Sequence, residues 1–216
     1  MELVARTPQT ARPAGASPLD LAALVGMAGW SRLPRAVRRR FAAAHADTVY
    51  LGTLDFECTA IGRCFAALSA MLGGPLTTLR RQAVPTEVRV ASNDRGGVVW
   101  ERRLHVPGRD TARIVRSTKE PGPGGALMER TDGGLAMQLD VFEEDGALVF
   151  SSRRYCLVLA GLRLPVPWWL TPGTCRVEHR DLGAGQFRFT LSMVHPWWGR
   201  TFHQSGVFAD PHEELA

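Results

Sequence analysis

Arg102 is the first residue of this sequence whose type and position could do chemistry. It lies two residues after Trp100 and two before Leu104, and a β-strand places every second side chain on the same face. That apolar face should point into the core, where a guanidinium needs a carboxylate or carbonyl partner to offset its desolvation. Glu129 is the partner that we expect. The arginine either anchors the acidic end of a ligand or forms a structural pair, and the structural interpretation is favoured.

Two histidines, His195 and His203, flank the Pro-Trp-Trp-Gly segment at residues 196–199. Histidine titrates near neutral pH, so either side chain could serve as a general base. Neither has an acidic neighbour in the sequence, and strand alternation places His203 on the face opposite Phe202 and Gln204. We expect surface or satisfied core positions for both, and we keep His203 among the candidate ligand-binding residues.

The motif Pro-Trp-Trp occurs twice, at residues 167–169 and 196–198. Tryptophan joins an apolar ring to a polar indole N–H, which suits the rim of a ligand pocket or a membrane surface. The same side chains could equally close the end of a sheet. The sequence does not decide between these alternatives.

Other motifs of known chemistry are missing or ambiguous. No Gly-x-Ser-x-Gly, His-Glu-x-x-His, Walker or EF-hand pattern occurs. The glycine-rich stretch at residues 122–125 contains a proline, which removes an amide donor, so we expect a turn there. Asp55 and Glu57 share one strand face and could be an acid–base pair or a solvent-facing pair. The four cysteines lack metal-binding spacing, and we expect neither a metal nor a cofactor.

A helical front end should precede the strands that carry these residues. Residues 1–16 have the composition of a mobile tail, and residues 17–216 should form one domain. Ser17 and Asp20 predict a first helix that ends near Met27. Further helices are predicted over residues 34–45 and 59–72, so that the front end spans residues 17–75.

Between residues 84 and 209 the apolar period changes to two, which predicts an antiparallel β body. About eight or nine strands joined by short turns are expected, among them residues 98–104, 187–193 and 201–208. Such a sheet must remove its edges, either by closing into a lipocalin-like barrel or by curling around the helix at residues 59–72. The sequence therefore predicts an α+β, mostly antiparallel β domain that is barrel-like or a strongly curved sheet.

The charged residues argue against a polyanion partner. The chain has 26 basic and 21 acidic residues, and Lys119 is its single lysine. Arginines 35, 38, 39 and 40 form a local cluster that could contact phosphate or anionic lipid, although a solvated helix face is favoured. We expect no nucleic-acid partner, and a membrane-surface contact is allowed but not favoured. No apolar run approaches the ~18 residues of a membrane span, and no export signal is visible, so a cytoplasmic location is expected.

Several short motifs follow one another along the chain. They are Leu-Pro at residues 33–34, Glu57 before a helix that ends in Gly-Gly-Pro at 73–75, Trp-Glu-Arg-Arg-Leu at 100–104, Glu-Arg at 129–130, Leu-Pro-Val-Pro at 164–167 and Pro-Trp-Trp-Gly at 196–199. In this order they resemble an uncharacterised bacterial family, domain of unknown function 4166, over residues 33–208. The resemblance implies a free-standing domain or the rear half of a protein whose front half is a Rossmann-type oxidoreductase. Gln204 and Val207 depart from the family pattern.

Three functions remain open from the sequence. The preferred one is binding of a small hydrophobic or amphipathic molecule in a β-enclosed pocket, because apolar strand faces are present without a recognisable catalytic constellation. The residues expected to line that pocket are Trp100, Arg102, Glu129, Phe187, Phe189 and His203. The second is a cofactor-free cyclase or isomerase that uses His203 or Glu129. The third, a docking role for a separately encoded Rossmann-type oxidoreductase, follows from the resemblance alone.

Overall fold

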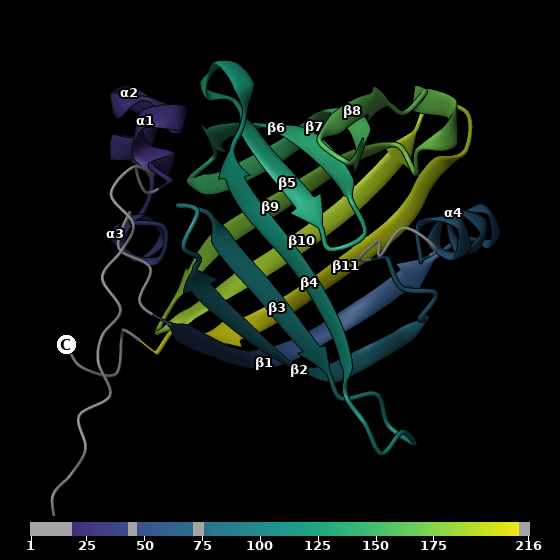
Figure 1. The fold of residues 1–216 in the computed structure, drawn as a ribbon. Helices are drawn as coiled ribbons and strands as arrows, with labels where there is room; N and C mark the ends of the chain where they lie inside the picture. Colours follow the sequence, from purple (N-terminus) through teal and green to yellow (C-terminus); the bar gives the residue numbers. More distant parts are fainter. Residues whose placement is uncertain (1–18, 43–46, 71–75, 212–216) are drawn as a thin grey trace, which may run out of the picture.

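The chain forms a closed antiparallel β-barrel with helices at its two ends, as seen in a computed structural model (Figure 1). The structure describes residues 19–42, 47–70 and 76–211. The barrel strands are β1 (Thr48–Cys58), β2 (Arg81–Ser92), β3 (Val98–Leu104), β4 (Arg113–Pro121), β5 (Leu127–Thr131), β6 (Leu135–Glu144), β7 (Ala147–Leu159), β9 (Thr174–Gly183), β10 (Gln186–His195) and β11 (Gly199–Ala209). The outer strand β8 (Leu162–Pro165) pairs with β7.

Three pairings between strands complete the closed ring. β6 and β7 form a long hairpin, β7 pairs with β9, and β11 pairs back with β1. The predicted mostly antiparallel, barrel-like fold is therefore confirmed, and the barrel is closed rather than curled around a helix. The expected helical segment at residues 59–72 is α4 (Ala60–Ala70), which lies at one end of the barrel (Figure 1). Its expected last residues fall outside the described ranges.

The first strand lies inside the segment that the sequence assigned to the helical front end. β1 places Tyr50, Leu54 and Phe56 in the core, with exposed or half-buried residues between them. Its glycine and acidic residues weaken the apolar alternation that identifies a strand. With this strand, the described residues contain ten barrel strands, which is more than the eight or nine expected.

The seam between β1 and β11 brings the two backbones very close. Gly52 pairs with Phe208, and Gly206 pairs with Leu54. A Cβ atom on Gly206 would lie 2.1 Å from the carbonyl oxygen of Thr53, and one on Gly52 would meet the next strand at a similar distance. Glycine is required at this seam because any side chain would push the closing strands apart.

Three short helices cover one end of the barrel, on the left in Figure 1: α1 (Leu21–Val25), α2 (Met27–Arg32) and α3 (Arg35–Arg40). Asp20 caps α1 by accepting a hydrogen bond from the Ala23 amide at 3.1 Å, while Ser17 lies outside the described residues. Phe41, which follows α3, is buried with its ring 5.9 Å from Trp100 and 4.9 Å from His179. The helices thus plug this end with apolar side chains. No helix within the described ranges is long and apolar enough to cross a membrane.

A buried ion pair fastens the plug to the end of the last strand. The Arg40 Nη2 atom lies 2.7 Å from Asp210 Oδ2, and both side chains are buried. The Arg40 guanidinium also lies 3.8 Å above the Phe187 ring. The expectation of a solvated arginine face is therefore wrong for Arg40, because this residue shares the inward face of α3 with Val37.

Candidate functional site

An apolar cavity of about 250 Å³ lies between α4, the start of β6, and the segment after β8. Its walls are mostly hydrophobic side chains contributed by several strands and by α4. They include Phe65, Leu68, Leu76, Leu135, Met137, Val166, Leu170 and Met193. Six polar residues contribute to the lining: Ser69, Ser117, Glu129, Thr131, Tyr155 and Thr171. A concave apolar site with a few polar groups is the usual form of a small-molecule pocket.

Two smaller cavities continue from the main one into the barrel. The second has a volume of about 30 Å³ and shares Glu129 and Met137 with the first. The third has a volume of about 10 Å³ and shares Arg102 with the second. The three spaces therefore follow one another from the α4 end towards the helical plug.

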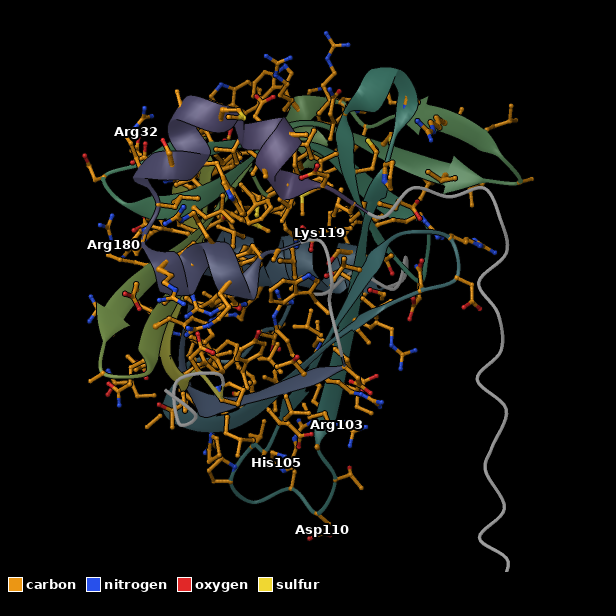
Figure 2. The ribbon with its side chains drawn as sticks, turned by 90° about the vertical axis from the view of Figure 1, so that its left-hand side faces the viewer. Arg32, Arg103, His105, Asp110, Lys119 and Arg180 are labelled. Carbon is orange, nitrogen blue, oxygen red and sulfur yellow. The ribbon has the colours of Figure 1, made fainter. Side chains whose placement is uncertain are left out.

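Lys119 and Glu129 form an ion pair inside the barrel. They are directly opposite each other on β4 and β5, with Lys119 Nζ 3.2 Å from Glu129 Oε2 and both side chains buried. Figure 2, viewed from the plugged end, shows Lys119 near the centre of the barrel, with Arg180 and Asp110 at its periphery. Burial tends to raise the pKa of Glu129, but Lys119, Ser117 and Arg102 outweigh it and hold that pKa below its ordinary value. Glu129 is consequently a carboxylate at neutral pH.

Arg102 lies near this pair without joining it. Among the described residues, none accepts a hydrogen bond from its guanidinium or lies within ion-pair distance of it. Its nearest aromatic contact is Phe189, whose ring centre lies 5.4 Å from the guanidinium carbon. Burial lowers the pKa of Arg102, partly offset by Glu129, but an arginine keeps its charge under such conditions. Arg102 lines both smaller cavities, so its cationic group borders internal space.

An aromatic cluster lies beyond Arg102 and beneath the plug. His179 is buried at its centre, with the rings of Phe41, Trp100, Phe150, Phe187 and Phe189 around it. Burial lowers the pKa of His179 well below its ordinary value, and the cations Arg40, Lys119 and Arg102 lower it further. The imidazole is therefore neutral, and adds no positive charge to the interior.

Five of the six residues that the sequence singled out for ligand binding line these internal cavities. Glu129 borders the first and second, Arg102 the second and third, and Trp100, Phe187 and Phe189 the third. The expected Arg102–Glu129 contact does not form, because Lys119 occupies the position beside the carboxylate.

His203 lies apart from the other five. It sits on β11 opposite Glu57, and it borders a surface hollow together with Arg80 and Arg200. Its neighbours Phe202 and Gln204 point into the barrel, as the alternation predicts. His203 therefore does not belong to the internal site.

His195 is buried at the α4 end of the barrel. Its Nδ1 atom accepts a hydrogen bond from the Trp197 amide at 3.1 Å. Rings of Phe65, Trp168, Trp197 and Trp198 surround it at centre-to-centre distances between 5.8 and 6.3 Å. His195 holds the two Pro-Trp-Trp segments together, and Nδ1 is committed to the backbone.

The two carboxylates of β1 point away from the barrel interior. Asp55 Oδ1 accepts a hydrogen bond from the Ala83 amide at 2.7 Å, and Glu57 lies 3.1 Å from Arg200. Phe56, between them, is buried. Of the two alternatives that the sequence left open for Asp55 and Glu57, an acid–base pair or a solvent-facing pair, the structure has the solvent-facing pair.

Sequence reasoning does not identify Lys119, Ser117 or Tyr155 as site residues. Lys119 and Ser117 follow Val115 at intervals of two on β4, so the alternation alone places all three on one face. Tyr155 borders the main cavity and donates a hydrogen bond from its hydroxyl to the Gly173 carbonyl at 2.9 Å. Because β4 carries charged and polar residues on both faces, its sequence does not indicate which face points into the barrel.

The fold and the cavities define a closed antiparallel β-barrel protein with an apolar internal cavity and a charged group at its inner end. The chain belongs to the family described as a domain of unknown function (DUF4166), whose model matches residues 33–208. The resemblance noted in the sequence is thereby confirmed over the span expected. None of the curated proteins matches the chain.

Proposed function

We propose that the barrel binds one small hydrophobic or amphipathic molecule in the main cavity. The observation that carries this proposal is an apolar space of about 250 Å³ with Glu129 at its inner side and the unpaired Arg102 behind it. This volume lies just below the range of typical small-molecule pockets, which begins at roughly 300 Å³. A compact ligand is therefore favoured over a long-chain lipid that would have to be fully enclosed.

The charges of the interior favour a ligand with an acidic group. Lys119 and Arg102 contribute two positive charges, and Glu129 contributes one negative charge. Arg102 is half-buried and borders the internal space, so an anion that reaches its guanidinium would gain a charge-assisted contact there. Arginine is also well suited to binding carboxylate or phosphate with two parallel hydrogen bonds.

Catalysis by a cofactor-free cyclase or isomerase has weaker support. Glu129 borders the cavity and could accept a proton from a substrate, but its lowered pKa makes it a weak base. The docking role for a Rossmann-type oxidoreductase and the cytoplasmic location remain predictions from the sequence.

A compact fluorescent acid, 2-anthracenecarboxylic acid, and its methyl ester provide a matched pair of probes. If the cavity binds the probe, Ser69→Leu on the buried face of α4 should weaken binding of both by filling cavity space, whereas Ala91→Leu at a half-buried position of β2 away from the cavity should not. Arg102→Leu should weaken the acid about tenfold or more and leave the ester unchanged. Unchanged binding of the acid by a folded Arg102→Leu protein would exclude the proposed role of the guanidinium, and failure of both probes to bind would count against the cavity.

A further inference from the structure

Four of the six tryptophans gather at the α4 end of the barrel. Trp168, Trp169, Trp197 and Trp198 are between 50% and 64% exposed. Leu162 and Leu164 on β8 are exposed as well. We call these six residues the tryptophan rim. Figure 1 shows that β8 and α4 lie at the end opposite the three-helix plug.

Tryptophan side chains of the rim contact one another and a shared histidine. The Trp168 and Trp197 rings meet edge to face with their centres 4.5 Å apart, although they come from segments about thirty residues apart. His195 supports both rings from beneath. Large aromatic side chains are therefore held in exposed positions, whereas a soluble surface rarely keeps apolar groups together in this way.

The segments that form the rim carry positive charge. Residues 161–170 and 194–200 and helix α4 contain Arg163, Arg200 and Arg63, and no aspartate or glutamate. Arg63 and Arg163 are exposed, while Arg200 pairs with Glu57 of β1. Exposed arginines beside apolar rings are attracted to a negatively charged surface.

The main cavity reaches the surface beside the rim. Leu68 of α4 and Leu170, which follows Trp169, both line the cavity and are 42% and 41% exposed. Val166, between β8 and the rim tryptophans, lines it too. A molecule leaving the cavity at this end would therefore meet the rim.

We propose that the tryptophan rim docks this end of the barrel on an anionic lipid bilayer. The indole rings insert at the level of the headgroups, where an apolar ring and a polar N–H are both accommodated, and the arginines contact lipid phosphates. This proposal rests on the proposed binding function. In this orientation an apolar ligand could pass between the bilayer and the cavity without crossing water. A lipid surface is favoured over a protein partner because exposed indoles lie beside the exposed Arg63 and Arg163, while the acidic neighbour Glu57 is paired with Arg200.

The test measures co-sedimentation of the full chain with vesicles of phosphatidylcholine alone and of phosphatidylcholine mixed with phosphatidylglycerol. The protein should bind the mixed vesicles, with a blue shift of tryptophan emission, and bind the neutral ones more weakly. The double variant Trp169→Ser/Trp198→Ser should lose at least about tenfold in affinity. Met27→Ser is the matched control, because Met27 is 90% exposed on the helical plug at the other end.

Reversing the charge of one arginine tests whether the arginines beside the tryptophan rim contribute to lipid binding. Arg163→Glu should weaken binding to the mixed vesicles, whereas Arg109→Glu in the exposed β3–β4 loop should have a smaller effect. No sedimentation with either vesicle would overturn the proposal, as would equal binding by the double tryptophan variant. A concentration-dependent dimer that the tryptophan variant abolishes, without vesicle binding, would assign the rim to a second copy instead.

These outcomes are separable from a failure of the binding function. Vesicle binding needs no bound ligand, so Ser69→Leu should sediment like the native protein even if it no longer binds 2-anthracenecarboxylic acid. Loss of probe binding with retained sedimentation would reject the cavity ligand alone, and the reverse result would reject the lipid contact alone.

Discussion

Lys119 and Glu129 face each other across β4 and β5, with their charged atoms 3.2 Å apart inside the barrel. The pair neutralises the single carboxylate near the main cavity and leaves the Arg102 guanidinium without a direct protein counter-charge among the described residues. Buried ion pairs seldom add stability over apolar packing, which agrees with the ligand-binding role proposed for this part of the barrel.

Removing the charge of Glu129 should be costly. Glu129→Gln leaves the buried ammonium of Lys119 without its carboxylate partner, and we expect a loss of about 3–5 kcal/mol in the free energy of unfolding. The measurement is urea denaturation at neutral pH. Glu120→Gln, which breaks the more exposed pair with Arg130, is the control and should cost less than about 1 kcal/mol. Equal effects of the two substitutions would show that the buried pair is not coupled.

His179 should make stability depend on pH. Its pKa is lowered in the folded barrel, whereas the unfolded chain takes up a proton near the ordinary value of 6.5. The unfolded state therefore binds more protons below that value, and stability should fall with decreasing pH by up to about 1.4 kcal/mol per unit. Thermal unfolding between about pH 5 and pH 7 measures this, above the range where Glu129 contributes. His179→Phe should flatten the profile, and His105→Phe at an exposed site should not.

The plug should depend on the Arg40–Asp210 pair. Asp210→Asn leaves the buried guanidinium of Arg40 without its carboxylate, and a loss of about 3–5 kcal/mol is expected. Relative to the native protein, Asp210→Asn should speed amide hydrogen exchange in α1–α3 and change it much less in the barrel strands. Glu57→Gln, at the exposed pair with Arg200, should change neither quantity appreciably. Unaltered exchange in the helices would mean that apolar packing around Phe41 alone holds the plug.

The β1–β11 seam should not tolerate a side chain at Gly206. A methyl group there would overlap the Thr53 carbonyl, so Gly206→Ala should lower the melting temperature strongly or prevent closure. Ser205→Ala, one residue earlier on the same strand, removes only a half-buried hydroxyl and serves as the comparison. Similar melting temperatures for the two variants would contradict the close approach.

The sequence predicts the core of the barrel better than its ends. The alternation around Trp100 and Phe187 identifies strands and places both side chains inside, because the apolar period of two is regular there. Strand β1 escapes detection because Gly52 and its acidic residues interrupt that period. Arg40 escapes because an arginine in a basic run resembles a solvated residue until Asp210, 170 residues away, is placed beside it.

In the candidate site, too, the sequence predicts what depends on local alternation and misses what depends on contacts between distant residues. Arg102 and Glu129 can be predicted to lie on inward strand faces from local alternation alone. The identity of the partner of Glu129 depends on the register between β4 and β5, which a two-residue period does not determine. The convergence of the two Pro-Trp-Trp segments around His195 depends on the strand order, which places the segment after β8 beside the β10–β11 turn.

Native mass spectrometry of the purified protein, followed by denaturing extraction, tests the binding function most directly. The barrel should carry one small apolar or acidic molecule per chain, and Ser69→Leu should carry less of it while Ala91→Leu retains it. A protein that is purified empty and stays empty after incubation with lipid mixtures would contradict ligand binding in the cavity.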